Sequence, residues 1–523
     1  MGIFEKLYQT ILNNRLYNFV KIPSQQSAYQ KGKGCQLHVM TIRLLKSLTK
    51  KTRTKLYITF TDFEAAFDLV SRRLLFKKLI GIGISSIMLT VLMSIYLASK
   101  SVIEHKGDFS DYLILLTGIK QGAPTSGLLY IIYTSGLIDI FNREFNAEPL
   151  IGLLHMLMHA DDILMLASTK QKAREKLLRL IKYSKENFIK LQLTKCAIMC
   201  VNSKDPDDYK ALIVDDITLK NVDKETYLGS VITNSHKIAI DVKEDIKHRS
   251  FNIIKFYAFL RENSHAPIHI KIKVLNSCII ASILHNCETW ANTNIQQLEV
   301  KYRRMLKCIL GVKQSTCSEL LFVELSIFPI GIQIMMKQFK FWKKVKTVIK
   351  DDDPLKFAIN EARRYRLNEV VYYDNLLNRY NSAEEIQAEF VNKNKEEIIR
   401  KAEQDRSKYK TYLQINPTLN TPTIYKNIRN KNELSMIAKI RLVSHNLQIE
   451  LGRRNNTPRE LRLCHCKEGV EDEEHFLIRC ESYTDIRLKF MINRDTTVEK
   501  ILNTDQYIQY VTELYKRRTF INS

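Results

Sequence analysis

The chain has no apolar run as long as 18 residues, the length that a helix needs to cross a membrane. Its start, Gly2-Ile3-Phe4-Glu5-Lys6, has no apolar stretch of the kind that a secretion signal carries. The ten cysteines are scattered along 523 residues, except for three near the C-terminus, so a disulfide framework is not expected. These absences favour a reducing compartment, and we expect a nuclear or cytoplasmic protein that is not secreted and has no membrane partner.

Lysine and arginine together number 81 against 56 aspartates and glutamates, which gives a net charge of +25 and a pI near 9.4. An excess of this size usually indicates a polyanionic partner, with nucleic acid ahead of a membrane surface. A solvated basic surface is the alternative. The length predicts two to four domains, and 45% hydrophobic with 26% charged residues is typical of a folded protein.

Two adjacent carboxylates, Asp161 and Asp162, stand in the middle of an apolar run from residue 153 to residue 167. The run predicts a strand, a tight turn and a second strand, with the two aspartates at the bend. A buried carboxylate without a partner loses several kcal/mol of hydration, so it needs a counter-charge or a shifted pKa. A hard cation with oxygen ligands would relieve the repulsion. The alternative is an ordinary solvated hairpin turn.

A second acidic site lies about a hundred residues earlier in the sequence. The β-branched and aromatic stretch 56–61 predicts a strand that ends at Asp62. Between the two sites, Gly118–Pro124 predicts a turn, and an apolar helix is expected from Leu128 to Ile140. Carboxylates at the ends of two neighbouring strands would form a two-metal site, in which cations roughly 3.5–4 Å apart stabilise the attacking and leaving oxygens of phosphoryl transfer.

Three short motifs occur in a fixed order: Asp62-Phe63-Glu64-Ala65-Ala66-Phe67-Asp68, then Gln121-Gly122-Ala123-Pro124, then Ala160-Asp161-Asp162. Each is weak alone, but their order and spacing resemble the palm of reverse transcriptases, and more narrowly that of non-LTR (LINE-type) retrotransposon enzymes. The resemblance implies an α+β right-hand polymerase: a palm with an antiparallel sheet, partial fingers and a helical thumb, then a helical connector and a small C-terminal zinc module. The implied partners are an RNA template, a DNA primer or target, and dNTPs.

The resemblance also assigns metal ligands and a proton donor. Asp62, Asp161 and Asp162 would hold two Mg²⁺ ions while a primer 3′-hydroxyl attacks the α-phosphate of a dNTP in line. The backbone carbonyl of Phe63 would complete one metal shell. Lys195 matches a lysine that is a candidate acid for the leaving pyrophosphate, although an exposed lysine without a role fits its place equally well.

Further residues would contact the incoming nucleotide. Phe67 matches a steric gate that excludes a ribose 2′-hydroxyl, and its alternative is a core aromatic at a helix start. Gln121 and Gly122 would pack near the nucleotide and the templating base. Lys31 belongs to a loop rich in lysine and glycine that can approach phosphates, or that is simply flexible. Gln30 of this loop stands where the family has an arginine, which weakens the case for triphosphate binding there.

Periodicity predicts several local elements. An amphipathic helix is expected from Gln171 to Leu191, with an apolar face made by Leu177, Leu180, Ile181 and Phe188. Two helices joined by a loop are expected in residues 1–50, and the apolar stripe of the first consists of Ile11, Leu12, Leu16, Phe19 and Val20. Tyr227–Ser230 resembles the primer-grip turn, where glycine lets the backbone approach the primer end. Basic residues in 301–307 would follow a duplex backbone, or form a solvated helix face.

Three cysteines and one histidine gather within 17 residues near the C-terminus: Cys464, Cys466, His475 and Cys480. They predict a tetrahedral site for one Zn²⁺ and resemble the C-terminal Cys–His module of LINE-type elements, although the family more often has two residues between the first two cysteines. His465 is a competing ligand, and reduced cysteines without metal are the alternative. The acidic run 471–474 is expected on the loop between ligand pairs, and the arginines within 453–462 are expected to face phosphates.

The expected domains are partial fingers at 1–54, the palm at 55–235, a helical thumb at 236–345, a helical connector at 346–435, and the zinc module with a tail at 436–523. Because the family's chains extend further upstream, this one resembles an N-terminally truncated copy or a fragment. His159 replaces the aromatic residue that is usual before Ala-Asp-Asp, and Ala123–Gly127 departs from the usual Cys-Pro-Leu-Ser-Pro. These departures keep a second function open, a catalytically weak or inactive reverse-transcriptase-derived RNA-binding protein. The oligomeric state is open.

Overall fold

The computed structural model describes residues 2–97, 99–291, 293–404, 407–426, 428–493 and 495–522. The chain divides into two compact units. The first consists of Met1–Asp245, Asn286–Thr293 and Phe341–Arg379, and the second of Ile246–His285, Asn294–Lys340 and Tyr380–Ser523. The segment 341–379 therefore packs with the first unit, whereas the sequence prediction divided it between the thumb and the connector.

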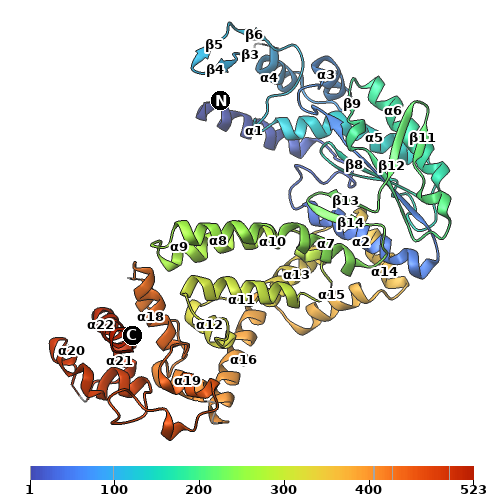
Figure 1. Ribbon diagram of the computed structural model, residues 1–523. Helices are drawn as coiled ribbons and strands as arrows, with labels where there is room; N and C mark the ends of the chain where they lie inside the picture. Colours follow the sequence, from blue (N-terminus) through green and yellow to red (C-terminus); the bar gives the residue numbers. More distant parts are fainter. Residues whose placement is uncertain are drawn as a thin grey trace. The chain divides into compact units, whose positions relative to one another are not determined.

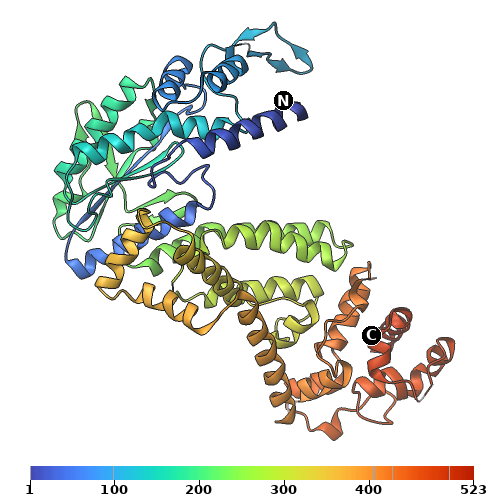
Figure 2. The same cartoon turned by 180° about the vertical axis from the view of Figure 1, so that it is seen from behind.

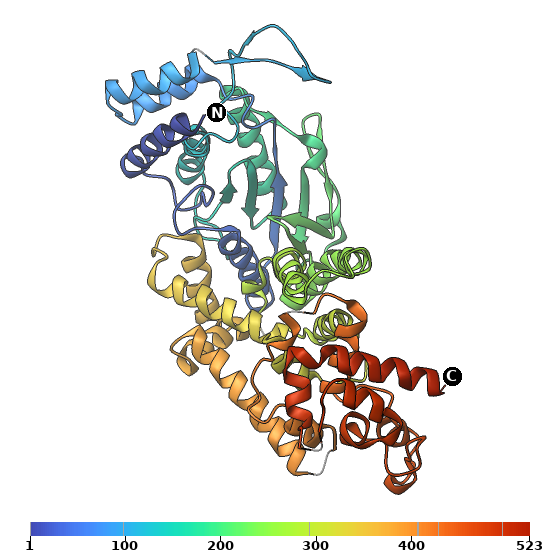
Figure 3. The ribbon, with the colours of Figure 1, turned by 90° about the vertical axis from the view of Figure 1, so that its left-hand side faces the viewer.

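A six-stranded sheet with the order β11-β12-β10-β1-β8-β7 lies at the centre of the first unit (Figure 1, Figure 3). Its strands are β1 (Leu56–Thr61), β7 (Met156–His159), β8 (Asp162–Ala167), β10 (Ala197–Val201), β11 (Leu212–Val214) and β12 (Ile217–Asn221). β1 pairs antiparallel with both β8 and β10, β7 pairs antiparallel with β8, and β10 pairs parallel with β12. The predicted strand before Asp62 and the predicted hairpin around Asp161 are both confirmed.

Both faces of the sheet are covered, because side chains alternate between two hydrophobic layers. In β1, Leu56, Ile58 and Phe60 join the layer that holds α2 (Cys35–Thr52) and α14 (Pro354–Arg364). Tyr57 joins the other layer, with α5 (Ser126–Glu144) and α6 (Lys170–Glu186). Figure 1 shows α5 and α6 on one side of the sheet and α2 and α14 on the other. A slip of one residue would exchange the layers, so burial fixes the register and with it the position of Asp62.

Helix α6 confirms one part of its prediction and corrects another. It begins after Thr169, whose side chain accepts a hydrogen bond from Lys172 N, and it buries Leu177 and Leu180. The helix ends at Glu186 rather than at residue 191, because Asn187 turns its Nδ2 back to the carbonyl of Tyr183. Phe188 follows with a positive φ of 54° and is 69% exposed. Its assignment to the buried face was therefore wrong.

Helix α1 (Ile3–Phe19) buries a narrower face than its sequence predicts. Gln9, Leu12 and Leu16 are buried and follow each other at helical spacing. Ile11 and Phe19 were expected on the same stripe, but they are 45% and 54% exposed. The buried Gln9 sets which side of α1 faces the interior, because its Oε1 accepts a hydrogen bond from Thr125 Oγ1 at 3.0 Å.

The remaining elements of the first unit are shorter. Helices α3 (Arg72–Gly81) and α4 (Ser86–Leu97) follow one another, and Gly83 between them has a φ of +81°. Four two-stranded pairs complete the strands: β2 (Phe63–Glu64) with β9 (Lys190–Leu191), β3 (Lys100–Ser101) with β6 (Leu113–Ile114), β4 (Glu104–His105) with β5 (Asp108–Phe109), and β13 (Lys224–Tyr227) with β14 (Ser230–Thr233). The last helix of this unit is α15 (Asn368–Arg379).

The described part of the second unit is helical (Figure 2). Its larger helices are α8 (Asn252–Glu262), α9 (Ile268–Val274), α11 (Gln296–Leu310), α12 (Ser318–Leu325), α16 (Ala383–Glu403), α17 (Ser407–Ile415), α18 (Lys431–Arg441), α19 (Gln448–Arg454), α21 (Val498–Asn503) and α22 (Ile508–Asn522). Two helices cross the boundary between the units, α7 (Ile238–Arg249) and α13 (Ile330–Thr347). A fully buried Arg441 joins α18 to α12 through two hydrogen bonds to Glu324, at 2.8 and 2.9 Å.

Among the described residues, no single helix has both the length and the apolar content needed to cross a membrane. Helices α12 and α13 meet the criteria of length and apolar content only when they are taken together, and the pair is bent by 61°.

Candidate functional site

The two adjacent aspartates lie at the turn of the β7–β8 hairpin. His159 pairs with Asp162, so the loop between the strands is only Ala160 and Asp161. Ala160 has a φ of +59°, a conformation that non-glycine residues adopt at a cost. The fully buried side chain of Gln26 stabilises the turn, because its Oε1 accepts hydrogen bonds from Ala160 N at 3.1 Å and from Ala28 N at 3.0 Å.

Asp62 lies beside this turn. Strand β1 pairs with β8 as far as Thr61 opposite Ile163, and one further step sets Asp62 next to Asp162. The three carboxylates influence one another: burial raises the pKa of Asp162 to about 6, and the charges of Asp161 and Asp62 add to the shift. Burial and Asp62 also raise the pKa of Asp161. The structure therefore brings together the three aspartates that the sequence singles out.

Lys195 supplies the positive charge next to these carboxylates. Its Nζ lies 2.7 Å from Asp62 Oδ2, and this hydrogen bond raises the pKa of the exposed ammonium. The turn before it is fixed as well, since Gln192 N donates to Asp62 O at 2.9 Å and Lys195 N donates to Gln192 O at 2.9 Å. Among the described residues, the three aspartates are not a set whose ligand oxygens all lie within 4.8 Å of one another.

An aromatic group lies on the α5 side of the aspartates. The ring of Phe67 stacks on Tyr130 at 5.0 Å, and its edge meets the ring of Tyr29 at 6.4 Å. Tyr29 lies against Gly127 so closely that a Cβ on this glycine would come within 2.4 Å of the tyrosine ring. Phe63 is buried and pairs with Leu191. Phe67 is half-buried and packs against the core, and its role as a steric gate stays a prediction.

The Gln121–Gly122 turn lies beside the segment that carries Phe67. Ile119 N donates to Phe67 O at 2.9 Å, and Gln121 Nε2 donates to Asp68 Oδ1 at 3.2 Å. Gln121 and Gly122 are exposed, and Gly122 has a φ of +78°. The two matched motifs are thus neighbours in space, although more than fifty residues separate Asp68 from Gln121.

Lys31 makes its contacts elsewhere. Its backbone N donates to the hydroxyl of Tyr17 at 3.1 Å, and its Nζ lies 5.3 Å from the centre of the same ring. The neighbouring Lys33 pairs with Asp353 at 3.0 Å and donates to Ser24 O at 2.7 Å. Within the described residues, Lys31 forms neither a hydrogen bond nor an ion pair with the three aspartates, and its role in nucleotide binding stays a prediction.

A buried polar network lies behind the aspartate turn, and sequence reasoning missed it. Ser27 Oγ lies 2.8 Å from His159 Nδ1 and 3.4 Å from His38 Nδ1, and the Tyr227 hydroxyl lies 3.2 Å from His38 Nδ1. Cys35 Sγ lies 3.8 Å from His159 Nε2. Burial lowers the pKa of both histidines, so both are neutral at pH 7. The sequence gives little indication of this network, because His159 stands out only as a polar residue in an apolar run.

Tyr227 leads directly into the turn that resembles the primer grip. β13 and β14 are joined by Leu228 and Gly229, whose φ values are +48° and +72°. Two positive φ angles in a two-residue loop are typical of a type I′ hairpin turn. Asn286 holds the turn from outside, because its Nδ2 donates to Leu228 O at 3.1 Å and to Ser230 Oγ at 3.0 Å. The tight glycine turn expected here is confirmed.

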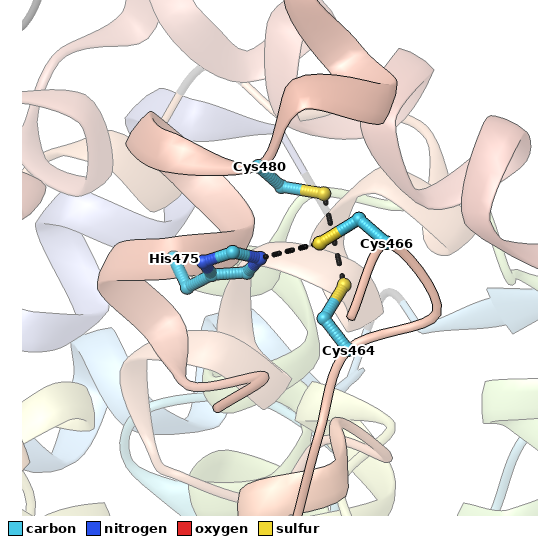
Figure 4. A group of neighbouring side chains, drawn as sticks. All are labelled: Cys464, Cys466, His475 and Cys480. Carbon is cyan, nitrogen blue, oxygen red and sulfur yellow. Dashed lines mark hydrogen bonds between the residues drawn. The ribbon is translucent and has the colours of Figure 1, made fainter. Parts of the chain in front are cut away.

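In the second unit, the side chains of Cys464, Cys466, His475 and Cys480 point toward one another (Figure 4). Cys464 Sγ lies 3.6 Å from Cys480 Sγ, and Cys466 Sγ lies 3.3 Å from His475 Nε2. All four ligand atoms lie within 4.8 Å of one another, so the group can hold a metal ion. Hydrogen bonding from the Cys464 thiol lowers the pKa of Cys480 below its usual range, which favours a thiolate ligand.

His465, the competing ligand, belongs to a second possible group with Cys464 and Glu471. Its Nδ1 lies 3.4 Å from Cys464 Sγ, and its ring meets the edge of Tyr483. The quartet offers three sulfurs and one nitrogen, whereas the second group shares Cys464 with it and cannot be used at the same time. The quartet is the more complete tetrahedral set.

Charged side chains around this cluster are paired within the fold. Glu471 and Glu473 lie between the two ligand pairs and are buried: Glu471 accepts two hydrogen bonds from Arg518, at 2.6 and 2.8 Å, and Glu473 lies 2.8 Å from His445 Nε2. Arg462 donates to the carbonyls of Thr457 and Ile449, at 2.7 to 3.2 Å, so its guanidinium holds the fold instead of facing phosphates.

Other arginines of this segment are also paired. Arg453 forms an ion pair with Glu450, and Arg459 lies 3.0 Å from Asp472. Arg454 is exposed, and its contact with phosphates stays a prediction.

A central, mainly antiparallel sheet that is covered on both faces and carries carboxylates at neighbouring strand ends is the arrangement of a polymerase palm, and the chain has an α+β right-hand polymerase fold. The family described as reverse transcriptase (RNA-dependent DNA polymerase) matches residues 1–232. Two retrotransposon proteins are also similar. The Retrovirus-related Pol polyprotein from type-2 retrotransposable element R2DM of Drosophila melanogaster is 21% identical over 253 residues, 47% of this chain and 24% of that protein. The Retrovirus-related Pol polyprotein from type-1 retrotransposable element R2 of Nasonia vitripennis is 26% identical over 274 residues. The match covers 51% of this chain and 24% of that protein.

Residues 1–232 thus match the reverse transcriptase family, and the similar curated proteins are polyproteins of R2 retrotransposable elements. The matches span about a quarter of the length of the two R2 relatives. Among solved structures, a telomerase from Candida tropicalis in complex with a fragment of telomeric RNA covers 68% of this chain and 57% of its own, at 13% identity and a TM-score of 0.33.

Proposed function

We propose that the chain is an RNA-directed DNA polymerase of a LINE-type retrotransposon. The observation that carries the proposal is the meeting of Asp62, Asp161 and Asp162 at two adjacent strand ends, with the Phe67 ring and the Gln121–Gly122 turn on neighbouring elements. The substrates would be dNTPs, an RNA template and a DNA primer or target. The charge of +25 supports a nucleic-acid partner, and a nuclear or cytoplasmic location follows from the same proposal.

The three aspartates fit a pair of Mg²⁺ ions. Their donor atoms are hard carboxylate oxygens, and the raised pKa values of Asp161 and Asp162 show that ionising them together is unfavourable without added positive charge. Bound metal ions would supply that charge and would stabilise the attacking and leaving oxygens of an in-line displacement.

The chain's own groups would act around this centre. Lys195 is exposed and charged, and release of its bond to Asp62 would free the ammonium to give a proton to the leaving pyrophosphate. Phe67, held between Tyr130 and Tyr29, would close the space next to the sugar C2′ position. The exposed Gln121 and Gly122 would line the nucleotide and template side.

We further propose that Cys464, Cys466, His475 and Cys480 bind one Zn²⁺ ion. The mutual approach of the four ligand atoms supports it, and a Cys₃His set is a common structural zinc site.

Primer extension with the purified chain tests the proposal. With a primed RNA template, dNTPs and Mg²⁺, the wild type should extend the primer, and Asp161→Asn should abolish extension because it removes a ligand of the metals. The fold should survive, since the burial that raises the pKa of Asp161 favours an uncharged side chain. Asp216→Asn is the control, because Asp216 is an exposed aspartate of the same unit.

Two results would contradict the proposal. Extension by Asp161→Asn at the wild-type rate would remove the carboxylates from the chemistry. A wild type that binds RNA but extends no primer would favour the alternative, a reverse-transcriptase-derived RNA-binding protein.

A further inference from the structure

Four polar side chains connect the two functional turns of the palm. At one end, His159 pairs across the hairpin with Asp162 and its Nδ1 lies 2.8 Å from Ser27 Oγ. At the other end, Tyr227 pairs across the Leu228–Gly229 turn with Ser230, and its hydroxyl lies 3.2 Å from His38 Nδ1. Ser27 closes the connection, because its Oγ lies 3.4 Å from the same His38 nitrogen.

The network is enclosed by the protein. Ser27 and His38 are 2% exposed, Tyr227 is 4% exposed, and His159 is half-buried. The rings are also packed on one another: His38 lies parallel to Tyr227 at 6.5 Å, and it meets His159 edge to face at 6.3 Å. His38 Nε2 has no hydrogen-bond partner among the described residues, so Ser27 and Tyr227 both contact the other ring nitrogen, Nδ1. Losing these contacts would leave further buried polar atoms unpaired, which costs free energy. Four residues from four different segments therefore constrain one another.

We propose that Ser27, His38, His159 and Tyr227 act as one positioning unit, which holds the Asp161–Asp162 turn at a fixed place relative to the Tyr227–Ser230 turn. The inference rests on the proposed function, in which the first turn carries the metal ligands and the second approaches the primer end. In-line attack requires the reacting oxygen and phosphorus to be aligned, and a misplacement of about 1 Å can cost roughly a hundredfold in rate. The hydrogen bonds fix this alignment, whereas apolar rings of similar size would allow the turns to shift.

Three variants change the hydrogen bonds at the two ends of the unit, His159 and Tyr227. His159→Phe keeps a ring but removes both nitrogens, and Tyr227→Phe removes only the hydroxyl. His159→Asn is the conservative variant, because an asparagine amide can place a polar atom near the position of the histidine Nδ1. Tyr515→Phe is the matched control: within the described residues the buried Tyr515 hydroxyl has no hydrogen-bond partner, and this residue belongs to the second unit.

Single-turnover extension on a preformed primer–template measures the rate constant, the KM for dNTP and the Kd for the primer–template separately. We expect His159→Phe and Tyr227→Phe each to lower the rate constant about 10- to 100-fold while the KM for dNTP changes less than threefold. The double variant should be no slower than the slower single variant, because one break already uncouples the turns. His159→Asn should recover most of the rate, and Tyr515→Phe should match the wild type.

Thermal unfolding of the same variants separates positioning from simple loss of fold. Multiplicative rate losses in the double variant, no recovery in His159→Asn, or losses explained fully by the fraction unfolded would each overturn the inference. If the wild type extends no primer, the proposed function fails by itself. The unfolding midpoints then decide about the unit: a double variant with less than the sum of the two single shifts supports it, and additive shifts overturn it.

Discussion

At the scale of single residues, Phe67 has two roles that one substitution can separate. Its ring stacks on Tyr130 and meets the ring of Tyr29 edge to face. Phe67 therefore lies both in the core and at the rim of the candidate site. We expect Phe67→Val to admit ribonucleotides, because a smaller side chain leaves room for the 2′-hydroxyl. The ratio of kcat/KM for dNTP over rNTP should fall at least tenfold, and the free energy of unfolding should fall by about 1 kcal/mol or more.

The control for this prediction is Phe76→Val. Phe76 is buried in the same hydrophobic layer, away from the motif, and its truncation should lower stability without changing sugar preference. An unchanged sugar preference in a folded, active Phe67→Val protein would leave Phe67 as a core residue only.

Single residues also show which parts of the candidate site could be predicted from the sequence. Asp62, Asp161 and Asp162 were predictable because each interrupts or ends an apolar strand, and a charge in such a place is costly unless it has a role. Gln26 and Ser27 could not be found, because their partners, Ala160 and His159, are more than 130 residues away. The buried Glu471 shows the same limit, since its partner Arg518 lies 47 residues further along the chain.

At the scale of elements, α3 is joined to its neighbours by one buried cation. Lys78 Nζ donates to Asn187 Oδ1 at 2.7 Å and to the carbonyl of Tyr133, and burial lowers its pKa to about 8. The unfolded chain, with a lysine pKa of roughly 10.4, binds more protons than the folded chain between about pH 8 and 10.4. The free energy of unfolding contributed by this group therefore rises with pH in that window.

Lys78→Met removes the pH-dependent contribution of Lys78 to the free energy of unfolding. The difference in unfolding free energy, wild type minus variant, should increase between pH 7 and pH 10, by at most roughly 3 kcal/mol. Urea unfolding at pH 7, 8.5 and 10 measures it, and Lys77→Met, an exposed neighbour on the same helix, should follow the wild type. A difference that stays constant with pH would contradict the buried position of the Lys78 charge.

Elements were predictable where pattern and burial agree. The strand 56–61 is buried at every position and was located correctly from its β-branched and aromatic sequence. The end of α6 was missed because a side chain, Asn187, stops the helix while the apolar spacing continues to Phe188. Two-residue strands such as β3 and β4 have too few positions to show any period.

At the scale of the whole molecule, the Cys/His cluster is part of a larger folded body than its sequence suggests. Tyr510 donates to the carbonyl of Leu477, and Arg518 binds Glu471, so α22 helps to hold the cluster. A short segment around the ligands would lose these contacts. The metal content is therefore best measured on the full chain.

We expect the full chain, purified in reducing buffer without chelator, to contain one equivalent of zinc. Cys466→Ser should lower the content below half an equivalent and lower the unfolding midpoint, because metal binding contributes to folding in small zinc modules. Cys278→Ser, an exposed cysteine outside the cluster, is the control. Extension of a preformed primer–template should be largely unchanged in Cys466→Ser, since the three aspartates lie in the first unit. A wild type with less than half an equivalent would count against the site.

The edge of the palm sheet has one further consequence. β7 is the last strand in the sheet order, and residues 25–27 close its outer side: Met158 N donates to Gln25 O and Ser27 N donates to Met158 O, both at 2.9 Å. An uncovered strand edge is a template on which another polypeptide can add a strand. We therefore expect the loop to keep copies of the chain from pairing through this strand edge. Substitutions that free it, such as Gln26→Ala, should first increase aggregation during expression, before any loss of chemistry in the protein that remains in solution.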